Sequence, residues 1–460
     1  MFFYIIEATI TISVLEYNEL KQQASQIPEL IKTINSLKEE IRLLRNGKNS
    51  GTSHTPPSHQ IGRPNSKNLR VKTGRKPGGQ HGHGGATLQI KEVPDEAVNY
   101  IPLYCNGCGA GLQQAAPVLE QSRQEVVIPL IQARYVEHRS YSKVCPHCGE
   151  VCTGALPSQF TAPIQYGGSV AAVVSYLSVY QYIPYHRITV LLKDLFGLPI
   201  SEGSIDNLLE RTAQKALPVY TAIQQSIQQS EVVGSDETGA SYGGKKGWFH
   251  TWQTTTLTFV VASLNRGYKT IEQYFKDGFP QSVYVSDCWA AQLKVKALLH
   301  QLCTAHLLRE LRNFEDALSC VWSAAMGQLL LDAIALKKQL TPQDYLQAPA
   351  AIVQIEERLD KLLLHDHPAL HKKTSAFAQR MIKNRGSILT FLHHPKVPPD
   401  NNGSERAIRN VKVKTKISGQ FRSERGATRF AILRSVIDTT IKNTRTIFEA
   451  LTLLTNLQPE

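Results

Sequence analysis

Long apolar runs are missing from this sequence. No stretch approaches about 18 apolar residues without a charge, which excludes a transmembrane helix and leaves no expected membrane partner. The apolar N-terminus, residues 1–12, lacks a cationic start and contains Glu7, so we expect no secretory signal peptide. A hydrophobic content of 42% is nevertheless ordinary for a globular protein, and it excludes a wholly disordered chain.

Acidic residues are fewer than basic ones. The chain has 51 Lys and Arg against 38 Asp and Glu, which gives a net charge of +13 at pH 7. The cations gather in a few segments, and clustered cations favour a polyanionic partner, nucleic acid before a membrane surface. At 460 residues the chain is long enough for several domains, each with its own core.

A heptad pattern lies near the N-terminus. Its apolar residues are spaced 4, 3, 4 and 3 apart, as at the a and d positions of a coiled coil: Leu30, Ile34, Leu37, Ile41 and Leu44. We predict a helix over residues 15–46, with Pro28 limiting its upstream extension. A self-associating coiled coil is favoured over one amphipathic helix packed on its own domain, because the next segment offers no core.

That next segment has no acid among its cations between residues 63 and 76 and is rich in Gly, Pro, Ser and His. The composition predicts a flexible basic linker over residues 47–95. Arg63, Arg75 and Lys76 stand in short "GRPNSK" and "GRKPGG" arms that resemble minor-groove binders. Nonspecific phosphate attraction or simple solubility is the alternative role of these three cations.

The eight cysteines include two Cys-x-x-Cys pairs, Cys105 with Cys108 and Cys145 with Cys148. Two such knuckles suit tetrahedral zinc, which predicts a zinc-ribbon-like module over residues 96–155 with a β-rich ribbon over residues 124–143. Four thiolates leave no open coordination position, so this zinc would organise the fold rather than catalyse. The alternatives are a pair of reduced thiol turns, or competition from His147 as a ligand.

Residues 156–230 are predicted to be a helical domain. The segment "YHRITVLLKDLFGLPISEGSIDNLLERTAQ" holds a helix, a break at residues 197–199, a capping Ser201 and a second helix. A DNA-reading helix-turn-helix and a plain helical hairpin both fit this pattern.

Two acids end two apolar strands. "EVVGSDETGA" runs into Asp236 and "SVYVSDCWAA" runs into Asp287, while "GWFHTWQTTTLTFVVAS" between them predicts two or three further strands. Carboxylates at the ends of neighbouring strands are placed to converge at the rim of a sheet.

A third acid, Glu405, stands among cations in "PDNNGSERAIRNVKVKTKISGQFRSERGA". A surface that merely bound an anion would omit this carboxylate, so we expect an acid of this segment to have a separate chemical role, with Glu405, Glu424 and Asp400 as the candidates. The surrounding cations are predicted to hold the DNA backbone: Arg406, Arg409, Lys412 and Lys414.

These motifs, together with "CTAHLLREL" at residues 303–311, resemble the DDE transposases of the insertion-sequence-66 family in the same order along the chain. The resemblance implies a multidomain α/β protein with a ribonuclease H-like core. Its two parts would be residues 231–309 and 393–460, separated by a helical insertion over 310–392. Carried over to this chain, the catalytic acids that bind Mg²⁺ (or Mn²⁺) are Asp236, Asp287 and Glu405. Cys303 and His306 match a family pair, with core packing, a hydrogen bond, zinc or DNA as their alternative roles.

The resemblance further implies a transposase of the bacterial cytoplasm that acts on nucleoid DNA. It would cleave the ends of a mobile element and join them to target double-stranded DNA, as a homo-oligomer and with accessory proteins from the same element as further partners. The main alternative is a catalytically silent DNA-binding zinc protein of the same descent, and a nuclease that cuts without joining is a third.

Overall fold

The protein is described here from a computed structural model, which covers residues 13–45, 88–364 and 371–457. The predicted linker contacts Arg63, Arg75 and Lys76 lie outside these residues. None of the helices within the described ranges combines the length and apolar character that a bilayer crossing requires.

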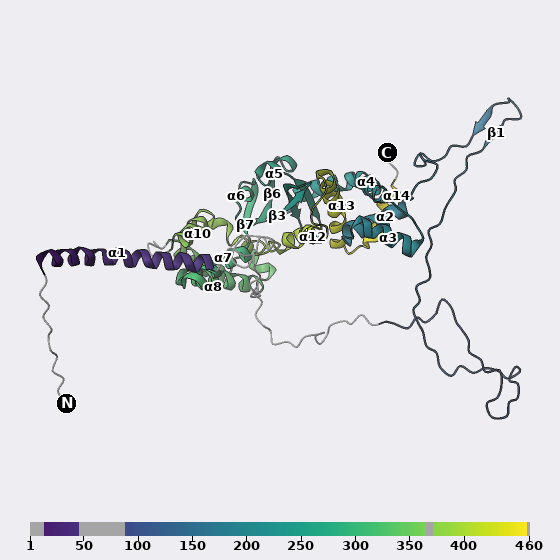
Figure 1. The fold of residues 1–460 in the computed structure, drawn as a ribbon, viewed down its shortest axis with the longest axis horizontal. Coiled ribbons are helices and arrows are strands. Elements are labelled where there is room, and N and C mark those ends of the chain that lie inside the picture. Colours follow the sequence, from purple (N-terminus) through teal and green to yellow (C-terminus); the bar gives the residue numbers. More distant parts are fainter. Residues whose placement is uncertain (1–12, 46–87, 365–370, 458–460) are drawn as a thin grey trace.

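A five-stranded mixed sheet lies at the centre of the molecule (Figure 1). Its strands are β3 (Val232–Tyr242), β4 (Lys245–Gln253), β5 (Thr258–Ser263), β6 (Phe279–Ser286) and β7 (Ala297–Leu302). The order across the sheet is β5-β4-β3-β6-β7; β3, β4 and β5 are antiparallel, and β6 and β7 continue the sheet parallel to β3. Gly243 and Gly244 both have positive φ, as the two-residue turn between β3 and β4 requires.

The strands predicted from the sequence at Asp236, at Asp287 and between them are present. β7 was not predicted, because "ALLHQL" is short and carries His and Gln among its apolar residues.

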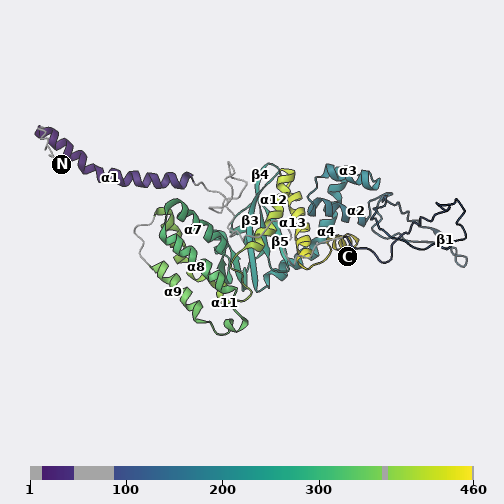
Figure 2. The same ribbon diagram turned by 90° about the horizontal axis from the view of Figure 1, so that it is seen from below.

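The sheet has a hydrophobic core on each face. Successive side chains of a strand point to opposite faces, so Tyr284 of β6 packs in one core while Val283 and Val285 pack in the other. The first core is shared with helices that precede and follow the sheet, and the second with helices inserted after β7. Figure 2 shows these two groups of helices on opposite sides of the sheet.

The first group includes the segment predicted to be helical at residues 156–230. Its elements are α2 (Gly168–Ser175), a short π-helix (Tyr176–Tyr180), α3 (Tyr185–Phe196) and α4 (Glu202–Gln228), joined by α13 (Glu424–Lys442) and α14 (Ile447–Asn456). Gly197 ends α3 with a φ of 61°, and Ser201 caps α4 by accepting a hydrogen bond from the Ser204 backbone N–H. The predicted helix–break–helix is therefore confirmed.

An ion-pair cluster around a buried arginine joins these helices to each other. Arg429 of α13 donates to the carboxylates of Asp206 and Glu210 on α4, and its own side chain is only 8% exposed. The helical segment is thus packed into the same core as the sheet. Whether α3 and α4 read DNA stays a prediction.

The second group fills the predicted insertion between β7 and the segment of Glu405. Its elements are α7 (Thr304–Leu318), α8 (Val321–Lys337), a 3₁₀ turn (Pro342–Tyr345), α9 (Ala350–Leu364), α10 (Lys372–Lys383), a 3₁₀ turn (Arg385–Ser387) and α11 (Thr390–His393). Two further short helices, α5 (Tyr268–Tyr274) and α6 (Ala290–Leu293), connect strands of the sheet.

The helix predicted over residues 15–46 is present as α1 (Val14–Arg45), but the expectation that Pro28 limits its upstream extension is wrong, because the helix runs through this proline. The side chains of this helix that the structure describes, at residues 14–38, 40 and 41, are exposed, so water can satisfy the backbone carbonyl that loses its partner at a proline.

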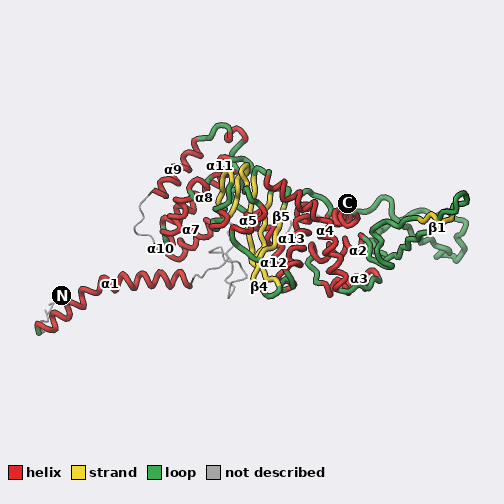
Figure 3. The backbone as a smooth tube through the Cα atoms, turned by 90° about the horizontal axis from the view of Figure 1, so that it is seen from above, coloured by secondary structure: helices red, strands yellow, loops and turns green. Residues whose placement is uncertain are grey.

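The β-rich ribbon is also absent from the described residues 124–141, and only a short hairpin of β1 (Ser142–Val144) and β2 (Val151–Thr153) forms. Apolar side chains of the expected ribbon, such as Ile128 and Leu130, are 84% and 98% exposed, because no strand or core lies against them. This segment extends from α2 and α3 mostly as loop (Figure 3).

Candidate active site

The strand register places Asp236 and Asp287 side by side. The pairing of parallel strands β3 and β6 ends with Gly234 opposite Val285, and each acid stands two residues beyond its member of that pair. Both acids therefore lie at the same edge of the sheet, as the sequence predicted. Asp236 lies within β3, which continues beside β4 alone, and Asp287 directly follows β6.

Glu405 reaches this edge on the first turn of helix α12 (Asn402–Ser418). The helix packs closely on β3 because Gly234 has no side chain. A Cβ there would lie 2.7 Å from the Ser404 Oγ and 2.9 Å from the Asn401 Oδ1. This close approach brings Glu405, the residue after Ser404, to the part of β3 that carries Asp236.

The three carboxylates influence one another electrostatically. Burial raises the pKa of Asp236 well above its usual range, and the charges of Glu237, Asp287 and Glu405 raise it further. The two rivals of Glu405 have other surroundings. Asp400 accepts a hydrogen bond from the Asn402 backbone N–H at 3.0 Å.

The other rival, Glu424, begins α13 and lines a hollow of about 220 Å³ with Tyr242 and Lys245. The fold thus places the three acids that the sequence singled out near enough for the charges of Asp287 and Glu405 to act on Asp236.

A buried hydrogen-bond network joins the three segments that carry these acids. We call Ser235, Ser286, Cys303, Asn401 and Ser404 the acid-linking network. The Cys303 N–H donates to the Ser286 carbonyl at 2.8 Å, and the Asn401 N–H donates to the Cys303 Sγ at 3.2 Å. The Asn401 Nδ2 donates to the Ser235 carbonyl at 2.6 Å, and the Ser404 Oγ donates to the Asn401 Oδ1 at 2.6 Å.

Each acid follows a member of this network directly in sequence: Asp236 follows Ser235, Asp287 follows Ser286 and Glu405 follows Ser404. In the structure Asn401 stands at the N-cap position, but its side chain bonds β3 and Ser404 instead of capping the helix.

On its other side Glu405 faces helix α7. Its Oε1 lies 3.7 Å from the His306 Nε2 and 3.3 Å from the Arg309 Nη2. Sequence reasoning left the role of His306 open and missed Arg309. The spacing of these two residues, three apart on one helix, is a signal that could have found Arg309.

Glu237 was also missed. Its side chain is 2% exposed and accepts hydrogen bonds from the Arg266 guanidinium at 3.0 and 3.1 Å and from the Gln292 amide at 3.0 Å. The Arg266 guanidinium in turn lies over the rings of Trp248, at 4.7 Å, and Trp289, at 3.9 Å. The two adjacent acids in "SDETG" are a signal that could have found Glu237. Because successive side chains of a strand point to opposite faces, Asp236 and Glu237 lie in different surroundings.

The four predicted DNA-binding cations of α12 fall into two classes. Arg406 and Arg409 are exposed. Lys412 is half-buried, donates to the Gly239 carbonyl at 3.2 Å and is close enough to Asp236 to sense its charge. Burial lowers the pKa of Lys414 to about 8.

The cysteine pairs form two similar knuckles. Each closes by a backbone hydrogen bond of 2.9 Å to the first cysteine from a glycine with positive φ, Gly109 or Gly149. The N–H groups of Cys108 and Gly107 lower the pKa of the Cys105 thiol, and those of Cys148 and His147 do the same for Cys145.

The distances between possible metal-ligand atoms single out a different group of residues. In the described part of the chain, the group of His, Cys and acidic residues whose ligand atoms all lie within 4.8 Å of one another is Cys303, His306 and Glu405. The structure does not bring three sulfurs of the two knuckles, or the three acids, this close together.

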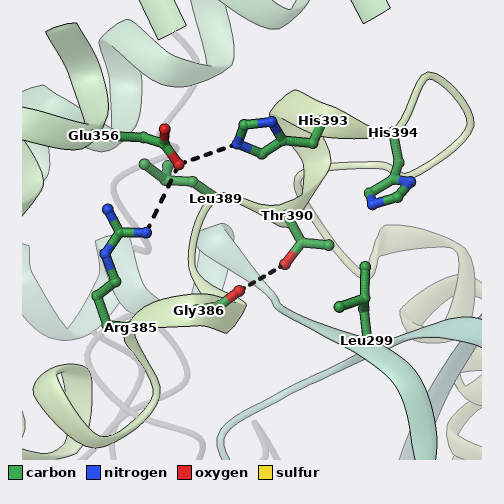
Figure 4. A pocket seen from close by; sticks show the side chains of 8 residues that line it. All are labelled: Leu299, Glu356, Arg385, Gly386, Leu389, Thr390, His393 and His394. Atoms are coloured by element: carbon green, nitrogen blue, oxygen red, sulfur yellow. Dashed lines mark hydrogen bonds and ion pairs between the residues drawn. The ribbon is translucent and has the colours of Figure 1, made fainter. Parts of the chain in front are cut away.

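A hollow of about 210 Å³ in the insertion lies apart from these residues (Figure 4). There the Glu356 carboxylate accepts from the His393 Nε2 at 3.1 Å and pairs with Arg385 at 3.7 Å. The hollow contains none of the predicted site residues.

A comparison with protein families matches residues 163–429 to the transposase IS66 family. A search of curated proteins gives no match. The matched range covers more than half of the chain and contains Asp236, Asp287 and Glu405. The chain therefore belongs to the IS66 family of transposases.

Proposed function

We propose that the protein is an active DDE transposase, which cleaves the ends of its mobile element and joins them to target DNA by two-metal-ion chemistry. The observation that supports the proposal is that Asp236 and Asp287 extend from one paired register of β3 and β6, while the charge of Glu405 acts on Asp236. These acids come from two strands and a helix that are far apart in sequence. A purely structural acid needs no such partners.

The topology supports a ribonuclease H-like core. Three antiparallel strands are followed by two parallel ones, in the order β5-β4-β3-β6-β7, which supports the ribonuclease H-like core that the family resemblance implies. The helices between β7 and α12 support the proposed insertion.

The donor set fits Mg²⁺ or Mn²⁺. Carboxylate oxygens are hard ligands, and the raised pKa of Asp236 means that these acids resist ionising together unless a cation joins them. Bound there, the cations would activate a nucleophile and stabilise a leaving oxygen at a phosphodiester. The chain itself contributes carboxylates held by the acid-linking network, and exposed Arg406 and Arg409 beside them to hold DNA phosphates.

The knuckles support a structural zinc site. Thiols whose pKa is lowered by backbone N–H groups are prepared to bind metal as thiolates. We assign the four ligands to Cys105, Cys108, Cys145 and Cys148, with the two knuckles approaching each other when zinc binds.

Double-stranded DNA, a second copy of the chain and accessory proteins of the element are the proposed partners, met in the cytoplasm at the nucleoid. Helix α1 supports the second copy, because the described a and d residues of its heptad are about half exposed: Leu30 57%, Ile34 48%, Leu37 53% and Ile41 48%. A catalytically silent DNA-binding protein is the second candidate, favoured by the knuckles and by the net charge of +13.

The test is Mg²⁺-dependent cleavage and strand transfer of labelled DNA, with element ends taken from inverted repeats flanking the gene. Glu405→Gln removes one ligand charge at nearly constant volume, so cleavage should fall by about 10³-fold or more, since the acids act as one unit. DNA affinity should hold or rise slightly, because the neighbouring cations remain.

Glu424→Gln is the matched control, an exposed glutamate in the first turn of the next helix. Normal cleavage by Glu405→Gln would remove the acid from the mechanism. DNA binding without any cleavage by the unaltered protein would favour the silent alternative.

A further inference from the structure

Cys303, His306 and Glu405 form a compact group of three different ligand types. Their ligand atoms all lie within 4.8 Å of one another, and Cys303 is buried while the other two are half-buried. We propose that this group is a second metal site, separate from the acid pair Asp236 and Asp287, which takes a borderline transition-metal ion such as Zn²⁺.

Two N–H groups and the helix N-terminus beside the sulfur favour a bound thiolate. Cys303 stands at the N-cap of α7, where the helix dipole favours negative charge, and the Asn401 N–H donates to its Sγ at 3.2 Å. The N–H groups of His306 and Asn401 both favour the thiolate. Burial opposes them and raises the pKa of the free thiol to about 12, so a metal ion must displace the proton on binding.

The position of the other two ligands follows from the helix. His306 is three residues after Cys303, which puts both on one face of the first turn of α7. The His306 Nε2 already lies 3.7 Å from the Glu405 Oε1, so the imidazole and the carboxylate face each other. Arg309 contacts the same oxygen at 3.3 Å and would have to release it when a metal ion binds.

The ligand chemistry selects the ion. A thiolate and an imidazole suit Zn²⁺ and Co²⁺ far better than Mg²⁺, which prefers oxygen ligands. Three protein ligands leave one position of a tetrahedral ion open to water, unlike the closed four-cysteine site proposed for the knuckles.

Glu405 would then be shared between two sites, which gives a regulatory consequence. This consequence rests on the proposed function. A Zn²⁺ ion held by Cys303 and His306 would draw Glu405 away from Asp236 and Asp287 and inhibit Mg²⁺-dependent cleavage. The inhibition should need the thiol, because Glu405 and His306 alone make a weak zinc site.

The binding test uses the full-length protein, first loaded with one equivalent of Zn²⁺ for the knuckles and then titrated with Co²⁺ without DNA. The unaltered protein should take up a further Co²⁺ with a thiolate-to-cobalt absorption band. Cys303→Ser should lose that band and bind Co²⁺ at least about tenfold more weakly, as expected for removal of one of three ligands. Cys152→Ser, which alters an exposed thiol in the knuckle region, is the control and should behave as the unaltered protein.

His306→Gln provides an independent variant if Cys303→Ser does not fold, and it should weaken Co²⁺ binding while shifting the band. Equal Co²⁺ uptake and equal spectra for all four proteins, or no thiolate band in the unaltered protein, would overturn the site.

Inhibition is measured separately as the Zn²⁺ concentration that halves each protein's own Mg²⁺-dependent cleavage. This concentration should rise at least about tenfold in Cys303→Ser. An unchanged value would overturn the regulatory role and leave the metal site standing. Absence of cleavage by the unaltered protein would instead count against the proposed function, and the Co²⁺ result would be unaffected.

Discussion

The acid-bearing edge of the sheet and the knuckle region prepare polar ligands for metal in opposite ways. At the sheet edge the supporting groups are buried: Ser235, Ser286 and Asn401 are 1%, 0% and 2% exposed. Around the knuckles even apolar side chains such as Leu130 are almost fully exposed. Packing therefore builds the first site without metal, whereas the second region has only local turns to hold its thiols. The first should tolerate loss of metal and the second should not.

Removal of zinc gives the largest difference between the two regions. Chelation, or Cys145→Ser, should disorder residues 96–155, because the apparent binding energy of structural zinc, about 10–16 kcal/mol in small peptides, is largely folding energy. Amide hydrogen exchange followed region by region measures this. Protection should vanish at the hairpin of β1 and β2 and stay unchanged in the sheet strands β3 and β6.

Cys152→Ser is the matched control, because Cys152 is an exposed thiol of the same hairpin outside both knuckles. If the hairpin keeps its protection after chelation, the knuckles need no metal and the comparison fails.

A break in the acid-linking network should cost less and leave the fold intact. Asn401→Ala removes the amide that bonds the Ser235 carbonyl and accepts from Ser404, so Glu405 loses its fixed position. Cleavage should fall about 10- to 100-fold, in turnover rather than in DNA affinity, and the required Mg²⁺ concentration should rise. Kinetics over a range of Mg²⁺ concentrations measure both effects.

The control is Asn402→Ala, at the exposed neighbouring position, which should cleave DNA at the normal rate. A pure loss of stability in Asn401→Ala, with normal turnover in the folded fraction, would make Asn401 structural rather than positioning.

The sequence predicted the strands and acids of the first region because their signals are local. Apolar runs that end in Asp236 and Asp287 describe buried strands, and the cations around Glu405 single it out. The acid-linking network could not be predicted, since the bonds of Asn401 to Cys303 and Ser235 join residues about a hundred or more positions apart. In residues 124–141 the local signal was misleading: β-branched residues predict a strand, but a strand needs a partner, which no local pattern supplies.

The contrast between exposed and buried groups also applies to the cations of α12 that are proposed to bind DNA. Arg409→Ala should lower the slope of log affinity against log salt by about 1, because an exposed cation that meets a phosphate releases one counterion. Lys414→Met should leave the slope almost unchanged, because its amine is partly buried and its pKa is lowered to about 8. Fluorescence anisotropy titrations at several salt concentrations measure the slopes. Equal slopes for the two variants would mean that burial in the free protein does not determine which of these cations contacts a DNA phosphate.

The smallest expected effect concerns stability without metal. Burial and the charges of Glu237, Asp287 and Glu405 raise the pKa of Asp236 in the folded state, while Lys412 is the nearby cation that opposes them. A raised folded-state pKa favours the neutral acid, so its contribution to stability is full below the unfolded pKa of about 3.9 and is lost as the pH rises towards the folded pKa.

The Asp236→Asn variant has no carboxyl group at this position, so it should not lose this stability as the pH rises. In Mg²⁺-free buffer its melting temperature should exceed that of the unaltered protein by about 2 °C or more at neutral pH, with no difference near pH 4, since 1 kcal/mol corresponds to about 2–4 °C in a domain of this size. Added Mg²⁺ should stabilise the unaltered protein and leave the variant unmoved, which would close the gap. Asp277→Asn, at an exposed position, is the control and should melt as the unaltered protein at every pH. A variant less stable than the unaltered protein at pH 7 would show that the carboxylate is stabilised by its surroundings, and the sheet edge would then be an ordinary structural cluster rather than a site held ready for cations.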